Sequence, residues 1–477
     1  MAKFEVVSAV PTLPRYISIQ GDNGLYLALK SDGLVSFDAK ETNNLTTFEV
    51  LYDADGALLI RSSANRRFWR RDASNYIRAT TLNVTDAGRF KASKLDTGNL
   101  AFQSTKDDLF LNRYARRVDG YNALETVPNQ WTEVRVTDAS DYAVRLPDYI
   151  WLKGNNGKYV HLHYERDLNW LKFHGDSPSD DWGTNQVIPL LDGSVALYNV
   201  KAGKFWRNST NWIWADVNKQ EDAESNPRCH FEPLKLGSEI VALKNQFNGL
   251  FCKRLTDYWQ SCLNAGTGSP NDSEARLIVG DATEKRSIFN VKYLMNLATT
   301  SDQKLQLVGR GSATNNSSNM MDMNVVVTLE NKVSKSSTWS NSFTFSQKVT
   351  TTFKCGVPFI GNAEIGVEIG TEQTFGHEWG ETTEETVQFQ TGYLVKDIGP
   401  GQMASVTVTC STAKIRIPFT YKCKDTALGG YDRGTVDYID GVYEGVAAYD
   451  TRAKVSNGGM VNEVKLRADE EGRAFIL

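Results

Sequence analysis

The sequence has few of the residues and motifs on which disulfide scaffolds, zinc sites and most enzymes depend. Cysteine occurs six times in 477 residues and no two cysteines form a CxxC pair, which indicates neither a disulfide framework nor a zinc site. GxSxG, HExxH, phosphate-binding glycine loops and EF-hand patterns are also missing, so we expect no enzyme, no cofactor and no bound metal. The cysteines are Cys229, Cys252, Cys262, Cys355, Cys410 and Cys423, of which Cys252 with Cys262, or Cys410 with Cys423, could pair after export.

Net charge and long apolar runs are equally sparse. The formal net charge of −4 argues against a nucleic-acid partner, although RRFWRR, from Arg66 to Arg71, is locally basic. The N-terminal MAKFEVVSAVPTLPRY lacks the apolar core of about 7–15 residues of a secretory signal. No apolar run approaches the roughly 18 residues of a spanning helix. We therefore expect synthesis in the cytoplasm.

Two sets of three repeats fill the first two thirds of the chain. GLYLALK, RRFWRRD and DLFLNRY place an aromatic residue at positions 26, 68 and 110, and GKYVHLH, GKFWRNS and GLFCKRL place one at 159, 205 and 251. Each unit contains short alternating β runs broken by Gly, Asn and Asp turns. Three units of about 40 residues with four short strands each predict a β-trefoil, because three propeller blades would not close a ring.

The two sets also match each other and carry a resemblance. RFWRRDASNYIRA in the first set corresponds to KFWRNSTNWIWA in the second. This tandem pattern, and GKFWRNSTNWIWAD in particular, resembles the agglutinin domains of amaranthin-type plant lectins. The resemblance implies binding of Gal/GalNAc-type glycans such as the T-disaccharide, where domains of two subunits meet. The residues that align for sugar binding are Asn75 and Tyr76, with Asn211 and Trp212 as counterparts.

The residue types at these positions suit a sugar. An aromatic ring stacks on the apolar C–H face of a pyranose while amide side chains bond its hydroxyl groups. Trp69 and Trp206 directly follow the repeat aromatic residue, and we expect them to fill the domain cores instead.

The last third predicts a different β architecture. Trp339, Phe343, Phe345, Val349 and Phe353 share one parity within a Ser/Thr-rich stretch, and the phase continues to Trp379 and returns at Val387. A period of two over such a span predicts extended strands with one covered face, longer than the usual three to ten residues or so. The chain is thus expected to be all-β: two tandem β-trefoils over 1–143 and 144–285, then an elongated β domain over 286–477.

Long Ser/Thr-rich strands around an alternating hairpin, placed after sugar-binding repeats, resemble the aerolysin-like pore-forming module. Agglutinin domains followed by such a module are typical of the plant Hessian-fly-response-type lectins. The resemblance implies a plant defence protein that assembles on glycosylated membranes, is cytolytic, and inserts a hairpin at about 348–375 into a shared transmembrane β-barrel. A homo-oligomer is implied, with a soluble dimer possible and a larger ring as the pore.

Within this hairpin each side chain receives a predicted role from its parity. Strands of roughly 9–11 alternating residues can cross a bilayer only when several subunits satisfy one another's backbone groups. The predicted tip, 357–362, joins a tight turn to an apolar wedge. The membrane-inserting residues are Phe353, Cys355, Val357, Phe359, Ile360, Ile365, Val367 and Ile369, and the pore-lumen residues are Lys354, Glu364, Glu368 and Glu372, with Lys348 beside them.

Two alternatives remain open at this stage. The same alternation describes a half-buried hairpin of a water-soluble sheet, so the chain could be a plant lectin that never inserts and whose C-terminal β domain is structural. The other alternative is a carbohydrate-active enzyme with tandem binding modules, which the missing catalytic motifs disfavour. His161 and His163 are expected to be exposed at a loop edge, and HEWGETTEE, from His377 to Glu385, is expected to be a solvated strand end. A pH trigger is conceivable, but nothing in the sequence distinguishes one histidine from another.

Overall fold

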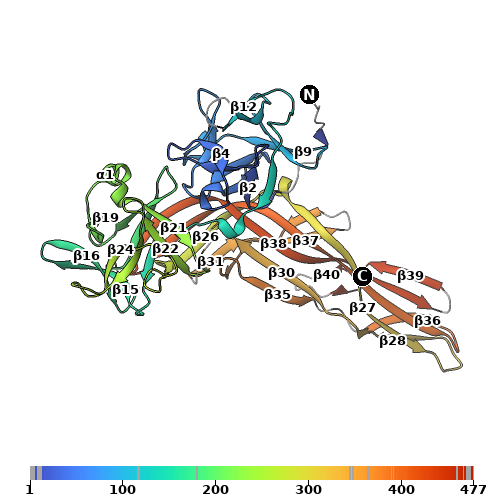
Figure 1. Ribbon diagram of the computed structural model, residues 1–477. Helices are drawn as coiled ribbons and strands as arrows, with labels where there is room; N and C mark the ends of the chain where they lie inside the picture. The colour runs from blue at the N-terminus through green and yellow to red at the C-terminus, as the bar shows by residue number, and fades with distance from the viewer. Residues whose placement is uncertain are drawn as a thin grey trace. The chain divides into compact units, whose positions relative to one another are not determined.

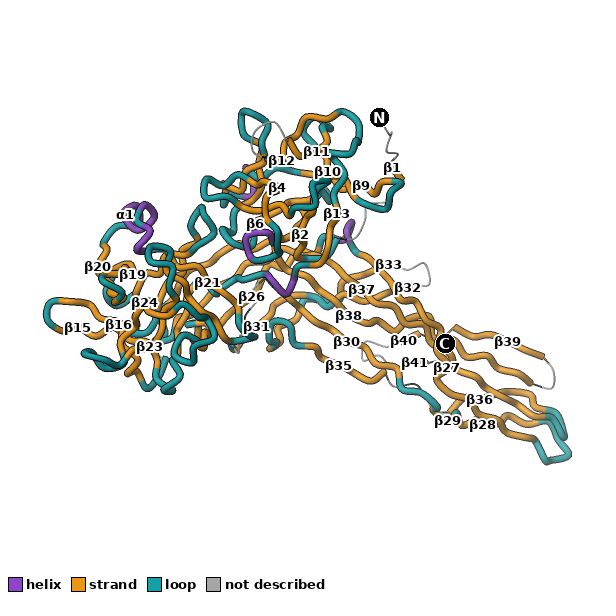
Figure 2. The backbone as a smooth tube through the Cα atoms, in the orientation of Figure 1, coloured by secondary structure: helices purple, strands orange, loops and turns teal. Residues whose placement is uncertain are grey.

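The computed structural model is almost entirely β-structure (Figures 1 and 2). It describes residues 6–7, 13–114, 119–178, 181–342, 345, 349–362, 366–387, 389, 392–457, 460–465, 467–468 and 474–475. The described helical segments are one α-helix, Gln220–Ser225 (α1), and the short 3-10 turns Asn44–Thr46, Val84–Asp86, Ser140–Tyr142, Pro227–Cys229 and Met295–Leu297. The chain divides into two compact units, of which the first holds Met1–Arg286, Ser342–Val349 and Lys424–Gly434.

The first sheet of the first unit is built from three four-strand units. Its strands are β1 (Val6–Val7), β2 (Tyr16–Gln20), β3 (Tyr26–Leu29), β4 (Val35–Ala39), β5 (Phe48–Tyr52), β6 (Leu58–Ser62), β7 (Phe68–Arg71), β8 (Ile77–Thr81), β9 (Phe90–Leu95), β10 (Leu100–Ser104), β11 (Phe110–Tyr114), β12 (Gly120–Glu125) and β13 (Arg135–Asp138). Antiparallel pairing runs β13–β2–β5–β6–β9–β10, and a bridge from Leu100 to Val134 closes this ring. The remaining pairs, β3–β4, β7–β8 and β11–β12, form three hairpins.

The second sheet repeats this arrangement. Its strands are β14 (Tyr149–Lys153), β15 (Tyr159–Glu165), β16 (Leu168–Gly175), β17 (Asn185–Pro189), β18 (Val195–Asn199), β19 (Lys204–Ser209), β20 (Trp212–Val217), β21 (Phe231–Lys235), β22 (Ile240–Asn245), β23 (Phe251–Leu255), β24 (Cys262–Thr267) and β25 (Leu277–Asp281). Here the ring β14–β17–β18–β21–β22–β25 closes through β25 and β14. The inner strands β16, β20 and β24 of its three hairpins pair with one another.

Each ring encloses an apolar core centred on a tryptophan. Trp69 and Trp206 are both fully buried, which confirms that they fill the cores. Rings of Phe48, Phe90 and Tyr121 meet Trp69 edge to face at 5.0–6.0 Å. The two indoles differ in polarity: Trp206 Nε1 donates to Asn185 Oδ1 at 2.9 Å, whereas Trp69 Nε1 is buried without a partner among the described residues.

A buried ion cluster lies where the second sheet ends. The Arg286 guanidinium donates to the carboxylate of Asp425 at 2.6 and 2.8 Å and to Asp281 at 3.0 Å. Burial raises the pKa of Asp281, and the arginine opposes that shift. Removal of the arginine would leave both carboxylates without their cationic partner, and this is costly because a buried charge needs compensation.

The second unit holds Ser287–Asn341, Thr350–Cys423 and Thr435–Leu477 and contains the longest strands. Its strands are β26 (Thr283–Tyr293, which begins in the first unit), β27 (Thr299–Thr314), β28 (Met321–Val326), β29 (Thr328–Leu329), β30 (Val333–Ser340), β31 (Thr350–Cys355), β32 (Pro358–Asn362), β33 (Gly366–Ile369), β34 (Gln373–Gly376), β35 (Thr382–Val387), β36 (Gly392–Ile398), β37 (Met403–Ala427), β38 (Asp432–Asn457), β39 (Met460–Lys465), β40 (Arg467–Ala468) and β41 (Ala474–Phe475). β37 and β38 run 25 and 26 residues (Figure 1). The unusually long strands expected between Val333 and Val395 are not found among the described residues there, because β30 to β36 run only four to eight residues each.

Candidate functional site

The predicted sugar residues of the first sheet lie at the turn between β7 and β8. Asn75 has a left-handed backbone (φ 67°), and its carbonyl accepts a hydrogen bond from Ala123 N at 3.1 Å. Its side-chain oxygen accepts from Arg71 Nη2 at 2.6 Å. The half-buried Tyr76 ring meets Tyr114 edge to face at 6.2 Å. The turn therefore engages the Asn75 oxygen internally.

Asn211 occupies the same turn of the second sheet, between β19 and β20, and Trp212 is the first residue of β20. Asn211 is also left-handed (φ 71°), and its carbonyl accepts from Ala265 N at 2.7 Å. Its side-chain oxygen accepts from Asn248 Nδ2 at 3.0 Å. An asparagine tolerates this backbone region better than most residues, so the turn itself accounts for its presence in both repeats.

Trp212 belongs to an aromatic cluster that the sequence did not reveal. The ring of Trp170 lies 5.8, 5.4 and 4.9 Å from the rings of Trp212, Trp214 and Trp259. Tyr258 extends this cluster and is 83% exposed. We call these five residues the aromatic cluster. They come from all three hairpins of the second sheet. Pairing of β16 with β20 places Trp170 directly opposite Trp214.

Two polar atoms of the aromatic cluster have no hydrogen-bond partner within the described part of the chain. The indole nitrogens of Trp170 and Trp214 are buried and lack a hydrogen-bond acceptor among the described residues. Arg166 lies over the Trp259 ring at 4.7 Å. Edge-to-face and tilted indoles beside the exposed Tyr258 present aromatic surface of the kind on which the apolar face of a sugar packs.

The histidines of β15 differ from the expectation of an exposed loop edge. His161 is only 8% exposed because it sits inside β15, and its Nε2 lies 2.9 Å from the Ser177 carbonyl. His163 lies 3.3 Å from Glu165, and both rings meet His174 edge to face. Burial lowers the pKa of His174. Within the described ranges, no group of three or more His, Cys, Asp and Glu side chains is arranged to hold a metal ion.

All six cysteines are buried thiols, and neither of the two conceivable disulfides is formed.

The predicted hairpin forms antiparallel pairs in the second unit. β31 pairs with β34 so that Phe353 faces Phe375 and Lys354 faces Thr374. β32 pairs with β33 so that Ile360 faces Val367. The connecting residues 363–365, and with them the predicted Glu364 and Ile365, lie outside the described residues, as does Lys348.

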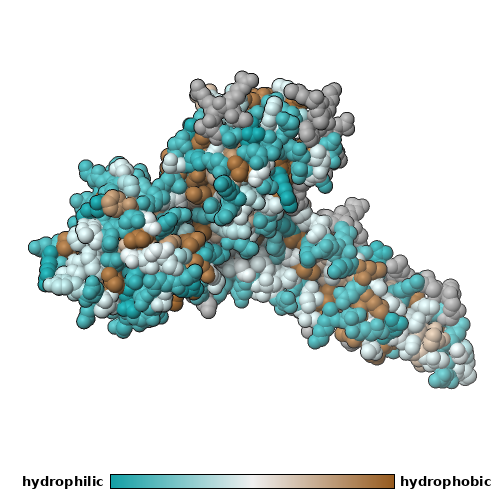
Figure 3. Space-filling view, viewed as in Figure 1, coloured by the Kyte–Doolittle hydropathy of each residue, from teal (hydrophilic) through white to brown (hydrophobic). Residues whose placement is uncertain are grey.

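The apolar side of β31 is packed into a core cluster of the second unit. Phe353, Cys355 and Ile360 are buried there, and Val357 and Val367 pack against the cluster. On the opposite side, Lys354 and Glu372 are more than half exposed and form an ion pair at 3.3 Å. Outside the hairpin, hydrophobic residues on the face drawn in Figure 3 stand in small groups among hydrophilic ones. The alternation therefore separates a packed side from a solvated side.

Most of the predicted tip is the strand β32, Pro358–Asn362, which follows a close backbone contact at Gly356. A Cβ added to Gly356 would lie 2.1 Å from the Gly370 carbonyl, so the two backbones approach too closely for another residue. Tyr293 and Tyr443 donate hydroxyl hydrogen bonds to the carbonyls of Gly356 and Pro358 at 2.9 and 3.4 Å. Pairing resumes at Pro358 opposite Ile369 and reaches Asn362 opposite Gly366.

The two apolar side chains of the predicted tip wedge differ in burial. Phe359 lies opposite Glu368 and is 41% exposed, while its neighbour Ile360 is buried. Ile369 is also exposed, at 38%. Neither Phe359 nor Ile369 therefore shares the burial of the other apolar residues that are described here.

His377 was expected at a solvated strand end, but it is buried against the hairpin. Its ring centroid lies 4.9 Å from Trp339, 5.7 Å from Phe353 and 6.4 Å from Phe375. Burial lowers the pKa of His377, and the nearby Glu381 and Glu378 oppose this shift. Its Nε2 has no hydrogen-bond partner among the described residues. The aromatic packing of β31 and β34 therefore distinguishes this histidine.

No helix among the described residues is both long enough and apolar enough to cross a membrane.

Comparisons with known proteins find two domain families. A model described as "Agglutinin domain" matches residues 144–279, and one described as "Aerolysin toxin" matches residues 287–432. Aerolysins of Aeromonas sobria and Aeromonas salmonicida are each 32% identical to this chain over 127 residues. That segment is 25% of this chain and 25% of the length of each aerolysin, so the match spans about a quarter of these relatives.

Solved structures with detectable similarity include a toxin and an immune protein. A mosquitocidal holotoxin is 10% identical, with 67% of this chain and 38% of the holotoxin covered at a TM-score of 0.32. A lamprey immune protein is 12% identical, with 95% of this chain and 100% of that protein covered at a TM-score of 0.29. At these TM-scores neither structure carries an argument about this chain. The two domain matches and the aerolysin similarity support a fusion of a lectin domain with an aerolysin-like domain.

Proposed function

We propose that this protein is a glycan-directed pore-forming defence protein. The observation that carries the proposal is the hairpin of β31–β34, whose apolar side is packed in the second unit while its other side presents Lys354, Glu368 and Glu372 to solvent. Such a segment can exchange its protein core for lipid while its charged side stays in water. The aerolysin match includes this segment.

The sugar-binding part of the proposal rests on the two closed strand rings. Six paired strands with three hairpins are the arrangement of a β-trefoil, and we assign one to each repeat set. The agglutinin match covers the second ring. We place its glycan contact at Asn211, Trp212 and the aromatic cluster, with Asn75 and Tyr76 as counterparts. A Gal/GalNAc-type glycan such as the T-disaccharide is the proposed ligand.

Insertion would follow attachment and assembly. Multivalent sugar contacts raise the local concentration of subunits on a glycosylated surface. Each subunit of the homo-oligomer then contributes one hairpin, because a single hairpin would leave its edge N–H and C=O groups unpaired in lipid. Phe353, Cys355, Val357, Ile360 and Val367 would face lipid.

The remaining hairpin assignments complete the proposed pore. Lys354, Glu368 and Glu372 would line a mildly cation-favouring lumen. We propose synthesis in the cytoplasm and action on target membranes. Lectins and pore-forming toxins are generally not enzymes, and no catalytic step is part of the proposal.

Dye release from liposomes that carry a Gal/GalNAc glycolipid tests this function. Leakage should occur, should be blocked by free competing sugar, and should stop when an engineered disulfide joins β31 to its sheet neighbour β26. A reducing agent should then restore it. Sugar-dependent binding without leakage under any activation would establish instead a lectin whose C-terminal domain is structural.

A matched pair of tryptophan variants tests the sugar site. Trp212→Ala removes a ring of the aromatic cluster. Trp182→Ala removes a ring outside this cluster, which is 42% exposed in the segment between β16 and β17 and has Lys201 over it at 5.0 Å. Loss of a stacking ring should weaken glycolipid binding about tenfold in the first variant. Equal binding by both variants would remove the aromatic cluster from the proposal.

A further inference from the structure

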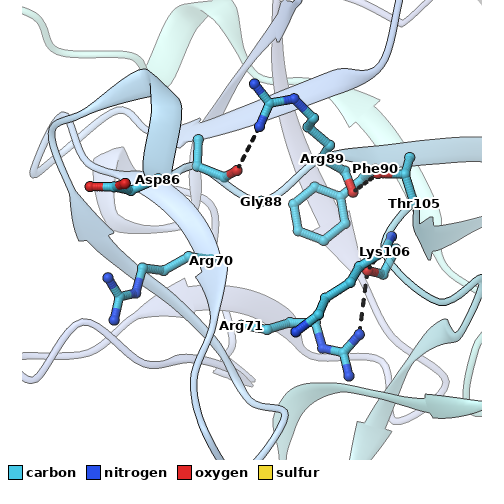
Figure 4. A pocket seen from close by; sticks show the side chains of 10 residues that line it. Arg70, Arg71, Asp86, Gly88, Arg89, Phe90, Thr105 and Lys106 are labelled. Atoms are coloured by element: carbon cyan, nitrogen blue, oxygen red, sulfur yellow. Dashed lines mark hydrogen bonds between the residues drawn. The ribbon is translucent and has the colours of Figure 1, made fainter.

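A pocket of about 440 Å³ in the first sheet has an unusual concentration of cations (Figure 4). Arg70 and Arg71 reach it from β7, Arg89 comes from the segment before β9, and Lys106 follows β10. The buried Phe90 ring lies between Arg89 and Arg71 in the view of Figure 4. We call this site the basic pocket. It contains Arg70 and Arg71, the last two residues of the RRFWRR motif, to which the proposed function assigns no role.

Two cations of the basic pocket are paired and hold its shape. Arg71 Nη1 contacts both carboxylate oxygens of Asp107 at 2.6 and 2.7 Å, and its Nη2 bonds Asn75. Arg89 Nε donates to Asp53 at 2.7 Å. The basic pocket is therefore tied directly to the turn that carries the predicted sugar residues.

The other two cations have no such partner. Across the part of the chain that the structure describes, the side chains of Arg70 and Lys106 form no ion pair or hydrogen bond, and both residues are exposed. Asp86 is the one carboxylate among the lining residues. The lining thus offers two uncommitted cations together with oxygen acceptors from Asp86, Ser104 and Thr105.

The second sheet supplies an internal comparison for the arginines. Alignment of RFWRRD with KFWRNS places Arg207 at the position of Arg70, and Asn208 at that of Arg71. Arg207 is neutralised by a two-point contact with Asp216. Asn208 is buried and donates to Asn245 at 2.8 Å.

The position of Lys106 differs in the same way. Alignment of Phe110 with Phe251 places Phe247 at this position, and Arg228 covers its ring at 3.8 Å. At the three positions compared, the second sheet therefore has one cation, Arg207, and this cation is already engaged by Asp216. The uncommitted charge is a property of the first sheet alone within this repeat pair.

We infer that the basic pocket binds an acidic sugar, a glycan residue that bears a carboxylate or a sulfate. This inference rests on the proposed glycan-directed function and specifies a second ligand class for it. Guanidinium groups bind such anions through two parallel hydrogen bonds, and the volume lies within the range of small-ligand sites. The nearby carboxylates accept sugar hydroxyls but repel a densely charged polyphosphate, which favours a polyhydroxylated monoanion.

Titration of the full chain with defined sugars tests the inference. The probes are sialyllactose for the carboxylate, a sulfated galactoside for the sulfate, neutral lactose, and phosphatidylserine vesicles for a lipid headgroup. Arg70→Gln with Lys106→Gln should weaken binding of the acidic sugar at least about tenfold, because it removes charge-assisted hydrogen bonds. Lys40→Gln with Lys94→Gln removes the same charge from exposed positions outside the pocket and should leave binding unchanged.

The outcomes separate this inference from the proposed function. Binding of neither acidic sugar, with neutral sugar binding and liposome leakage intact, overturns the inference alone. Equal loss in both double variants also overturns it, because only general charge would then matter. Pocket-dependent binding of phosphatidylserine vesicles without acidic-sugar binding would assign the site to a lipid headgroup instead. Failure of every sugar to bind would remove the proposed function as well.

Discussion

Replacement of Phe353 by alanine measures how strongly the second unit holds the hairpin. The Phe353 ring is fully buried, and its centroid lies 5.1 Å from that of Trp379 and 5.8 Å from that of Phe375. Truncation of a fully buried phenylalanine costs about 3–5 kcal/mol, from lost transfer free energy and the cavity left behind. Local opening of β31 should become easier by this amount.

Amide hydrogen exchange of β31 and β34 reads this local opening directly. With about 1.36 kcal/mol per decade, Phe353→Ala should speed exchange there by roughly two to three and a half orders of magnitude. The measurement avoids the assumption that a chain with several domains unfolds in one step.

Phe359→Ala is the matched control in the same hairpin. Phe359 is 41% exposed on the opposite side, so its truncation should cost less than about 1 kcal/mol and speed exchange by less than about fivefold. Equal acceleration by both variants, or none by Phe353→Ala, would refute the argument that one apolar side anchors the hairpin.

Three further predictions concern buried polar groups. Burial lowers the pKa of His377, so its neutral ring contributes stability that is fully present above the ordinary pKa of about 6.5 and is lost as pH falls from there through the lower folded-state pKa. Hairpin exchange, corrected for intrinsic pH effects, should therefore rise as pH falls below about 6.5. A rise that persists in His377→Phe would exclude this residue as its cause. Trp206→Phe should cost about 1 kcal/mol more than Trp69→Phe in urea unfolding, because only Trp206 loses a hydrogen bond, and equal costs would contradict that bond. Arg286→Met should destabilise the first unit by about 3–5 kcal/mol. A second substitution, Asp281→Asn, should recover part of this loss because it removes one uncompensated charge. An unchanged urea midpoint in Arg286→Met would show that the buried ion cluster contributes nothing to stability.

Local patterns in the sequence predicted a substantial part of this molecule. The repeated aromatic positions identified six β units. Trp69 and Trp206, which directly follow the repeat aromatic residues Phe68 and Phe205, are the fully buried centres of the two cores. Alternation also predicted which side of β31 is packed, because side chains in a strand point to opposite faces at every step. Both inferences need only neighbours along the chain.

The hairpin tip shows where such a local rule fails. The sequence predicted 357–362 as a tight turn with an apolar wedge, yet after the close approach of Gly356 to Gly370 the chain forms the paired strand Pro358–Asn362, with Ile360 buried and Phe359 exposed. The signal was present as a glycine in a strand, which often marks a bulge or a close backbone contact. Its effect depends on a partner strand that the local pattern does not identify.

The sequence by itself determined the all-β class, the repeat units, the centres of the two cores and the packed side of β31. Only the tertiary structure decided which distant side chains meet: the aromatic cluster from three hairpins, the basic pocket from three segments, and His377 against the hairpin. The physical reason is that strand periodicity is a local property of the backbone. A binding site instead depends on strand register and closure between segments that lie tens of residues apart.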